Sequence, residues 1–439
     1  MRILLVGSGA REHAIAKAIC KHEGAELYSY MSSNNPGMRK LSKEYVLGNI
    51  VKDNEVVSWA VSKKIELAVI GPEAPLSAGV SDALWRQGIK CVGPVKEAAK
   101  LEWDKGYTRY LMKKYSIPGC PRFEIFRDVR DAQDFIEELK EVAIKPAGLT
   151  GGKGVKVTGF QLKGLEEAKD YAREVLEQNI GTLKAVVIEE RLVGEEFTLQ
   201  CFVDGKSLVP APCVQDFKRA YEGDEGKNTG GMGSYNDRTT LLPFMRKEDY
   251  DNALEIMKKT VDSFRKDTGL EYKGFLYGQF MATRDGVKLI EYNSRLGDPE
   301  AINMLAILKS DFVDMLYSIC DGKIRNVQFQ NKATVCKYVV PKEYPDNPKA
   351  GDLIEINEDR IAKNNTEIYY ASVEEREGRV YTGSSRSLAL LSVADSIDEA
   401  EHNVENSTRY IHGEIRHRRD IATKEVIDKK VEFMDRLRE

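Results

Sequence analysis

The chain has 439 residues, with 66 Lys and Arg against 70 Asp and Glu, which gives a net charge of −4. This length exceeds what one hydrophobic core usually supports, so roughly two to four domains are expected, and the charge balance excludes the broad cationic field that nucleic-acid binding needs. No apolar run approaches the roughly 20 residues that span a bilayer, and the seven cysteines are scattered without zinc spacing, so we expect a cytoplasmic protein with small-molecule partners and neither a nucleic-acid nor a membrane partner.

The first hundred residues alternate short apolar runs with helical segments. The opening run RILLVGSG ends in glycines, and apolar residues at helical spacing follow from Glu12 to Cys20, as in a β-turn-α unit. Further buried strands are predicted at LYSYM, LAVIG and KCVG, with helices from Asn54 to Lys64 and from Leu76 to Gln87. This alternation predicts a doubly wound, Rossmann-like α/β domain over residues 1–103.

From Lys105 the pattern changes to helices mixed with antiparallel strands. A helix to Tyr115 and the breaker SIPGCP precede a strand-helix-strand unit that ends in EVAIKPAG. Later strands are predicted at AVVIEE, EEFTLQCFV, YGQFMA and VKLIEYN, and a long helix from Lys247 to about Thr268 separates the two pairs. We predict a second α/β unit over residues 104–325 and, from four further strands and a helix from Ile397 to about His412, a small α+β domain over residues 326–439.

The first motif with chemical potential is GSGAREHA, where a strand ends in glycines and a helix begins. Backbone N–H groups and the helix dipole at such a turn can meet a phosphate. Glu12 stands where a dinucleotide fingerprint has its third glycine, so the motif alone leaves a phosphate site and a structural turn as alternatives. His13 follows the turn and either touches a substrate or caps and packs on its helix.

Glycines and lysines gather in KPAGLTGGKGV. Lys145 closes a strand, and Lys153 lies among the glycines of a loop that can fold over polyphosphate. Val155 stands where a P-loop needs a hydroxyl, which argues against a Walker-type site. The alternative to phosphate binding is a plain hairpin tip.

Two further polar segments allow functional and structural interpretations. VIEERLVGEEF carries two pairs of glutamates that either hold adenine and ribose or are exposed edge charges. QDFKRAYEGDEGKNTGGMGSY is a long glycine-rich loop between ordered segments, and loops of this kind are often functional. Asp216 and Lys218 either line a substrate pocket there or belong to a mobile surface loop.

The most informative motif is KLIEYNSRLGDPE. Alternation along an apolar strand points Glu291, Asn293 and Arg295 to one face, where two oxygen ligands stand beside a guanidinium. Mg²⁺ prefers such oxygens together with phosphates, and Arg can stabilise developing negative charge. Gln279 on the preceding strand supplies another possible ligand oxygen. The alternative is a salt bridge between strand neighbours.

The chain resembles the phosphoribosylamine–glycine ligase family of ATP-grasp enzymes in a series of motifs that keep the family's order: GSGAREHA, GPEAPL, KPAGLTGGKGV, VIEERLVGEE, KNTGGMG, GFLYGQFM and EYNSRLGDPE. The resemblance runs from Met1 to about Lys323. It implies a Rossmann-like N-terminal domain, central ATP-grasp domains with a lid-like subdomain at about 118–188, and a C-terminal domain that completes the substrate cleft. The implied reaction joins glycine to 5-phosphoribosylamine with ATP and Mg²⁺ or Mn²⁺ in purine biosynthesis, through glycyl phosphate.

The resemblance also implies roles for individual residues. The implied ATP contacts are Lys105, Lys145, Gly151, Gly152, Lys153, Glu189, Glu190, Leu192 and Glu196, with Glu195 as an alternative to Glu196 at the ribose. The implied substrate contacts are Gly9, Arg11, Glu12, His13, Pro72, Glu73, Asp216, Arg295, Asp298 and Arg386. The implied metal ligands are Gln279, Glu291 and Asn293, and the implied catalytic residues are Arg295, Lys153 and Asp216.

The chain departs from the family pattern at several points, and other functions remain open. Ala147 removes a carboxylate from the usual KADG, Gln279 replaces an apolar residue, and the C-terminal YYAS and HRRDIA differ from the usual HAGT and YR-x-DIG. The alternatives are another ATP-grasp ligase, such as a purine-pathway carboxylase or formate-dependent transferase, a nicotinamide-dependent oxidoreductase, and a nucleotide-binding module without catalysis.

Overall fold

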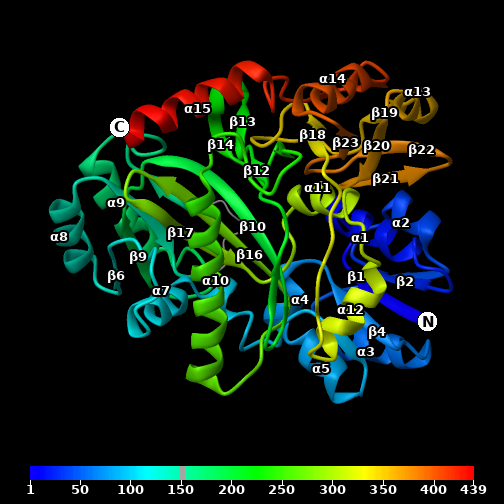
Figure 1. Ribbon diagram of the computed structural model, residues 1–439, viewed down its shortest axis with the longest axis horizontal. Coiled ribbons are helices and arrows are strands. Elements are labelled where there is room, and N and C mark those ends of the chain that lie inside the picture. Colours follow the sequence, from blue (N-terminus) through cyan, green and yellow to red (C-terminus); the bar gives the residue numbers. More distant parts are fainter. Residues whose placement is uncertain (149–153) are drawn as a thin grey trace.

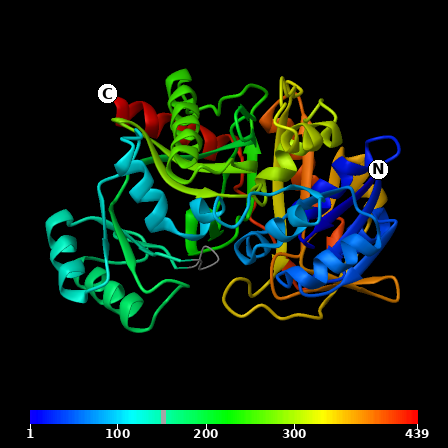
Figure 2. The ribbon, with the colours of Figure 1, turned by 90° about the horizontal axis from the view of Figure 1, so that it is seen from below.

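The computed structural model describes residues 1–148 and 154–439. The predictions for Gly151, Gly152 and Lys153 therefore lie outside the described residues. In both ribbon views the N-terminal domain (blue) and the C-terminal domain (orange) lie side by side, and the central domains (cyan to green) form the other half of the molecule (Figure 1, Figure 2). The expected multidomain organisation is confirmed.

The N-terminal domain is built on a parallel sheet in the order β3-β2-β1-β4-β5. Its elements are β1 (Arg2–Val6), α1 (Ala10–Cys20), β2 (Glu26–Met31), α2 (Pro36–Leu41), β3 (Glu44–Leu47), α3 (Asp53–Ser62), β4 (Leu67–Ile70), α4 (Glu73–Ala78), α5 (Val80–Arg86) and β5 (Lys90–Val92). Ile3 and Leu5 of β1 are buried with α1, whereas Leu4 and Val6 are buried with α3 and α5. Helices thus cover both faces, which confirms the doubly wound, Rossmann-like domain.

Two details of this domain differ from the sequence prediction. The helix expected from Leu76 to Gln87 is divided into α4 and α5 by Gly79, whose φ of +89° is a left-handed conformation that favours glycine. The edge strand β3 is absent from the prediction, because it is only four residues long and its apolar run Tyr45–Leu47 is shorter than those of β1 and β4. Propensity and periodicity therefore found the buried strands and missed the exposed one.

The short helix α6 (Lys100–Trp103) and α7 (Lys105–Lys114) lead into the lid-like part, an antiparallel sheet in the order β6-β9-β7-β8. Its elements are β6 (Phe123–Phe126), α8 (Val129–Leu139), β7 (Val142–Pro146), β8 (Lys156–Val157), α9 (Leu165–Glu177) and β9 (Val186–Glu190). Apolar residues of α8 and α9 are buried against β7 and β9, so this part has its own core.

The central sheet is antiparallel and has the order β11-β10-β16-β17. Its elements are β10 (Gly194–Asp204), β11 (Leu208–Pro210), α10 (Lys247–Thr268), β16 (Lys273–Thr283) and β17 (Gly286–Asn293), followed by α11 (Glu300–Ala306) and α12 (Phe312–Cys320). The predicted long helix agrees with α10. Between Gln279 and Phe280 the register skips Ile290, which forms a bulge in β17.

The C-terminal domain confirms the α+β prediction, but its sheet is shared. The order β12-β15-β18-β23-β20 begins with two strands from the glycine-rich segment in mid-chain, β12 (Gln215–Asp216) and β15 (Gly233–Asn236). Between them lie β13 (Arg219–Tyr221), the 3-10 helix η1 (Glu222–Asp224) and β14 (Glu225–Asn228). The later elements are β18 (Ala333–Pro341), β19 (Leu353–Ile356), α13 (Glu358–Lys363), β20 (Thr366–Tyr370), β21 (Val373–Arg376), β22 (Arg379–Thr382), β23 (Leu388–Ala394), α14 (Ile397–Thr408), β24 (Ile411–His412), β25 (Ile415–Arg416) and α15 (Lys424–Arg438).

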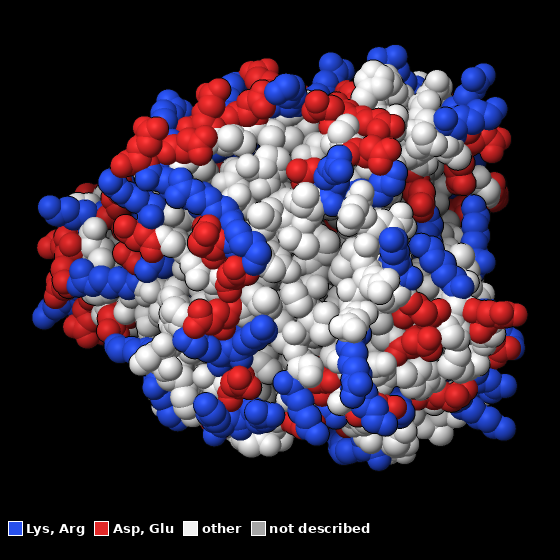
Figure 3. All heavy atoms as spheres, viewed as in Figure 1, with Lys and Arg blue, Asp and Glu red and all other residues white. Residues whose placement is uncertain are grey.

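Both signs of charge lie close together on the face shown in Figure 3, around a central area of uncharged residues. No continuous cationic field covers this face. Within the part of the chain that the structure describes, no helix is both long and apolar enough to cross a bilayer.

Candidate active site

The strand pair β16 and β17 forms the centre of the candidate site. Gln279 of β16 lies opposite Glu291 of β17, and Tyr277 lies opposite Asn293. Glu291 and Asn293 are two residues apart and half-buried, so their side chains share one face of the sheet. We call this the metal face, because it carries the predicted metal ligands.

Arg295 reaches the metal face by a different route from the one that strand alternation predicts. β17 ends at Asn293, so the expected continuation of the strand to Arg295 is wrong. Its Nη2 donates to Asn293 Oδ1 at 3.3 Å, and its guanidinium lies 3.4 Å from each of two carboxylates, Glu73 of the N-terminal domain and Glu102 of α6. Burial raises the pKa of Glu102 to about 7, against the opposing effect of Arg295.

A buried ionic cluster joins the lid to the bulge of β17. Lys145 Nζ lies 2.8 Å from Glu189 Oε2, and Arg109 of α7 donates to both oxygens of Glu189 at 2.6 and 2.9 Å. Both cations also donate at 2.9 Å to the carbonyl of Ile290, and Arg109 to that of Leu289. Burial lowers the pKa of Lys145, which Glu189 opposes. Among the described residues, Lys145 thus contacts Glu189 and the carbonyl of Ile290.

A second cluster lies next to the metal face. Lys218 Nζ lies 3.0 Å from Glu196 and 3.9 Å from Asp216, and the amide nitrogen of Gln279 donates to Glu196 at 2.8 Å and to Asp216 at 3.4 Å. Burial alone would lower the pKa of Lys218, but Asp216, Glu196 and Glu291 raise it well above its usual value. Burial raises the pKa of Asp216, which Lys218 opposes. Lys218 is therefore a firmly held cation within the field of the metal face.

The donor groups fit Mg²⁺ at Glu291 and Asn293 more directly than at Gln279. The Gln279 side chain is completely buried, and its oxygen accepts hydrogen bonds from the hydroxyls of Tyr277 and Thr198. Because carboxylates only accept, its nitrogen must face Glu196 and Asp216, and metal ligation through its oxygen requires the amide to turn over. Glu291 and Asn293 offer the hard oxygens that Mg²⁺ prefers on a half-buried face.

The first glycine turn encloses a carboxylate. Glu12 is 3% exposed, its Oε2 accepts from the N–H of Gly9 at 2.6 Å, and its Oε1 lies 2.5 Å from Arg11 Nε. A Cβ on Gly71 would lie 2.3 Å from Glu12 Oε1, and one on Gly7 would lie 2.7 Å from Glu12 Cγ. The glycines of this turn therefore make room for Glu12, whereas in a dinucleotide fingerprint they serve the cofactor, which argues against the oxidoreductase alternative.

The GPEAPL segment lies between the turn and Arg295. Pro72 precedes α4, and a Cβ on Gly7 would lie 2.8 Å from its Cδ. Burial raises the pKa of Glu73, but Arg295 and Arg11 together lower it below its usual value. The residues predicted to bind substrate from two distant parts of the chain are thus brought to one location.

His13 faces the C-terminal domain. Its Nδ1 accepts from the N–H of Tyr370 at 2.9 Å, and its ring stacks on Tyr370 and meets Tyr369 edge-on. A Cβ on Gly37 would lie 2.0 Å from its ring. Burial lowers the pKa of His13 to about 3, with a smaller contribution from Lys17. The ring is neutral and packed between domains, which favours the packing interpretation over substrate contact.

Arg386 connects two motifs. It donates to the carbonyls of Gly230 and Gly231 at 2.7 and 2.8 Å, its Nη2 lies 3.1 Å from Asp298 Oδ2, and its guanidinium lies 4.2 Å from the centre of the Tyr338 ring. The hydroxyl of Tyr338 donates to the other oxygen of Asp298. Arg386 therefore holds the NTGGMG and GDPE segments together, so a phosphate there would compete with these acceptors.

The remaining predicted ATP contacts surround the lid sheet. Lys105 begins α7, and its Nζ donates to the carbonyl of Gly148 at 3.3 Å. Glu190, at the end of β9, accepts from the N–H of Arg122 at 2.8 Å, and Leu192 follows in the connection to β10. These residues and Lys145 belong to or adjoin the lid, whereas Glu196 belongs to the central sheet.

Four residues of these clusters are missing from the sequence predictions: Glu102, Arg109, Tyr277 and Glu300. The Tyr277 hydroxyl lies 2.9 Å from Glu300, and burial raises the pKa of Glu300 to about 7, with a further contribution from Asp216. In the sequence, Arg109 looks like an ordinary basic residue of a helix. Glu102 and Arg295 lie near opposite ends of the central region in the sequence, so no local pattern connects them. Lys218 is one of the residues for which the sequence offers a substrate pocket or a mobile loop, but its pairing with Glu196 is not predicted.

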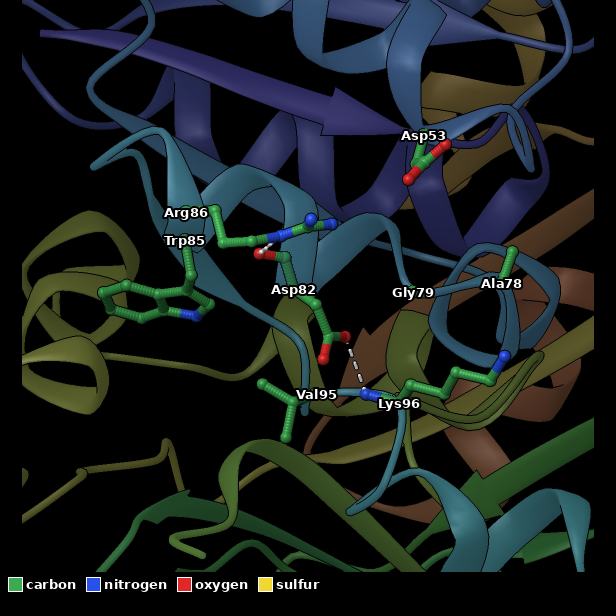
Figure 4. A pocket seen from close by; sticks show the side chains of 8 residues that line it. All are labelled: Asp53, Ala78, Gly79, Asp82, Trp85, Arg86, Val95 and Lys96. Atoms are coloured by element: carbon green, nitrogen blue, oxygen red, sulfur yellow. Dashed lines mark hydrogen bonds between the residues drawn. The ribbon is translucent and has the colours of Figure 1, made fainter.

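A separate depression of about 480 Å³ lies in the N-terminal domain (Figure 4). Its polar groups are partly engaged with one another, since Asp82 accepts from the backbone N–H of Lys96 at 2.8 Å. The residues that line it are Asp53, Ala78, Gly79, Asp82, Trp85, Arg86, Val95 and Lys96. None of them is a predicted site residue. It is a wide surface hollow apart from the clusters described above.

Family models and individual relatives agree on the family to which the chain is similar. Models of phosphoribosylglycinamide synthetase match residues 1–102 (N domain), 103–301 (ATP-grasp domain) and 334–424 (C domain). A phosphoribosylamine–glycine ligase of Methanocaldococcus jannaschii is 51% identical over 445 residues and the full length of both chains. The crystal structure of the corresponding Thermotoga maritima enzyme has a TM-score of 0.82 and 29% identity, with 96% of this chain and 100% of that chain covered.

A more distant structure shows the fold alone. The biotin carboxylase domain of Hydrogenobacter thermophilus 2-oxoglutarate carboxylase, in complex with MgADP and bicarbonate, has a TM-score of 0.73 and 16% identity, with 99% of this chain and 93% of that chain covered. The fold is thus shared with a protein of low sequence identity. From the family models and the full-length relative, we conclude that this chain belongs to the phosphoribosylglycinamide synthetase family.

Proposed function

We propose that the protein joins glycine to 5-phosphoribosylamine in purine biosynthesis, with ATP converted to ADP and phosphate. The observation that carries this proposal is the meeting of three groups: the metal face of β17, the cation Lys218, and Arg295 paired to Glu73 of the N-terminal domain. A nucleotide site and an N-terminal substrate segment thereby adjoin the same arginine.

In the first chemical step, a carboxylate oxygen of glycine attacks the γ-phosphorus of ATP, which forms glycyl phosphate and releases ADP. The amine of phosphoribosylamine then attacks the acyl carbon, the C–O bond to phosphate breaks, and the amine loses a proton as the amide forms. Negative charge shifts in both steps, so fixed cations are required.

ATP binds between the lid sheet and the central sheet in this proposal. Lys105 and Lys145 face the phosphates from the lid side, and Lys153 of the glycine loop is the further predicted cation. Glu190, Leu192 and Glu196 line the adenosine end. The MgADP complex of the distant biotin carboxylase domain supports a nucleotide site in this architecture.

The metal is held by Glu291 and Asn293, with Gln279 as the third predicted ligand only if its amide turns over. Mg²⁺ supplies charge neutralisation at the phosphates, and Mn²⁺ is an acceptable substitute for a ligand set made of oxygens. Lys218 adds a fixed positive charge beside these ligands.

The substrates lie on the N-terminal side of the metal face. Asp216 and Asp298 are suited to the ammonium group of glycine, and Arg295 to the negative charge that develops on the acyl group. Gly9, Arg11, Glu12 and the Pro72–Glu73 segment form the surface for phosphoribosylamine, with Arg386 as the candidate phosphate ligand. Seven free cysteines are consistent with a reducing compartment, and we propose the cytoplasm.

Phosphate release with ATP, glycine and freshly made phosphoribosylamine tests this function when each substrate is omitted in turn. We expect release only with all three, and release without glycine would overturn the proposal in favour of another ATP-grasp reaction. Glu291→Gln should abolish turnover, whereas Asp285→Asn, the same chemical change at the exposed turn before β17, should leave it unchanged.

A further inference from the structure

The C-terminal helix α15 crosses from the C-terminal domain onto the central sheet. In Figure 1 it is the red helix along the upper edge, and it contacts β10 and β16. The family model for the C domain ends at residue 424, the first position of this helix. The helix thus lies beyond the matched C-domain model, although full-length relatives include it.

Two kinds of contact fix α15 in place. Ile427 and Met434 are buried in the main core, so the helix covers apolar surface of the central domain. Arg438 Nη2 lies 2.7 Å from Asp249 Oδ2, and both side chains are 7% exposed or less. Asp249 also accepts from the N–H of Arg246 at the start of α10. The helix is thus held at its far end by a buried ion pair.

Between these anchors, Lys430 contacts the wall of the nucleotide site. Its Nζ donates to Glu195 Oε2 at 2.7 Å, with 15% of each side chain exposed. The same ammonium lies 5.5 Å from the centre of the Phe217 ring. Glu195 directly precedes Glu196, and Phe217 lies between Asp216 and Lys218. One lysine therefore contacts both segments that carry the Glu196–Lys218 pair, the start of β10 and the connection between β12 and β13.

Gln215 completes the connection. Its side-chain nitrogen donates to Glu195 Oε2 at 3.0 Å and to the backbone carbonyl of Glu196 at 2.9 Å, and its oxygen accepts from Tyr235 at 2.9 Å. The Glu195 carboxylate is therefore shared between Lys430 and Gln215. Removal of Lys430 would leave this half-buried carboxylate without its cation and would loosen its connection to the Asp216–Lys218 segment.

We propose that Lys430 is a positioning residue for ATP, which holds β10 and the Asp216–Lys218 segment at the separation that nucleotide binding needs. The proposal rests on the nucleotide site of the proposed function. Lys430 acts through Glu195 on the neighbouring Glu196, which the proposed function places at the adenosine end of ATP, away from the reacting γ-phosphorus. Its loss should therefore raise the KM for ATP more than it lowers kcat.

The test compares Lys430→Met, Lys430→Arg and the control Lys429→Met. Lys430→Met keeps the aliphatic stem and should weaken MgATP binding, measured by titration calorimetry, by roughly tenfold, the effect of one charge-assisted hydrogen bond. Lys430→Arg keeps the charge and reach and should recover most of the affinity. Lys429, 69% exposed and paired with Glu425 on the same helix, should tolerate replacement within about twofold.

Two outcomes would overturn the proposal: unchanged MgATP affinity in Lys430→Met, or a fall in kcat with an unchanged KM for ATP. A combined Lys430→Met and Glu195→Gln variant should bind MgATP no more weakly than the weaker single variant, and additive losses would show that Lys430 does not act through Glu195. MgATP affinity is measured without glycine or phosphoribosylamine, so failure of the proposed ligation leaves this result interpretable.

Discussion

Replacement of Arg109 by methionine separates structural charge from ligand-binding charge in the lid. Arg109 is 2% exposed, donates twice to Glu189 and reaches two carbonyls of the β17 bulge. Loss of one partner of a buried ion pair typically costs about 3–5 kcal/mol. Lys145 stays 2.8 Å from Glu189 and retains part of the interaction, so we expect the lower end of this range, ~3 kcal/mol.

Hydrogen exchange of peptides from β7 and β9 measures this loss locally, which suits a chain of several domains whose global unfolding need not be two-state. A loss of ~3 kcal/mol corresponds to roughly a hundredfold faster exchange in these strands. Lys113→Met is the matched control on the same helix, because Lys113 is 65% exposed and its partner Glu124 is 49% exposed. Equal exchange in the two variants would refute the assignment of Arg109 and Glu189 to a buried structural pair.

Three further predictions concern the N-terminal side of the site. Glu102→Gln removes one of the two carboxylates beside Arg295, and steady-state kinetics should show a fall of about tenfold in kcat with little change in the KM for ATP. Gly71→Ala drives a methyl group into Glu12 and should raise the KM for phosphoribosylamine. His13 has a folded pKa of about 3, below its usual 6.5, so the unfolded chain takes up the proton first and stability falls as the pH drops from 6.5 toward 3. In His13→Gln, the stability lost between pH 7 and pH 5 should be smaller than in the wild type, as measured by the urea midpoints at these two pH values.

Each of these variants has a control in the same chain. Glu97→Gln changes an exposed partner of Lys100 next to α6 and should leave kcat unaffected. Gly164→Ala enters open space and should have no effect on the KM for phosphoribosylamine. His402→Gln alters an exposed ring and should keep the wild-type pH dependence. If a variant and its control behaved identically, the role assigned to the corresponding contact would be wrong.

The sequence predicts those parts of the fold whose signal is local. Apolar strands and the 22-residue helix α10 carry their periodicity within a few residues, and the predicted helix from Lys247 agrees with its bounds. The division at Gly79 and the exposed strand β3 carry weaker local signals. No helix is predicted at α15 from the sequence, although Ile427, Val431 and Met434 stand at helical spacing and pack on the core.

The site shows the same limit in a stronger form. Glu291 and Asn293 share a face because strand alternation is local. Arg295 lies beyond the end of the strand, and its partners Glu73 and Glu102 come from distant segments. Arg109 meets Glu189 across 80 positions, and no spacing rule connects them. Pairings of this kind depend on how whole domains pack, so they become visible only in the folded chain.

The sharing of strands between the glycine-rich segment and the C-terminal sheet has a consequence for how the protein can be divided. β15 pairs along its length with β18, so the hydrogen bonds of one sheet join residues 233–236 to residues 334–337. A cut between the central and C-terminal domains would leave both β15 and β18 with open edges, which invite pairing with other chains. Exchange of the C-terminal domain with that of a relative must therefore include the mid-chain segment that carries β12 and β15.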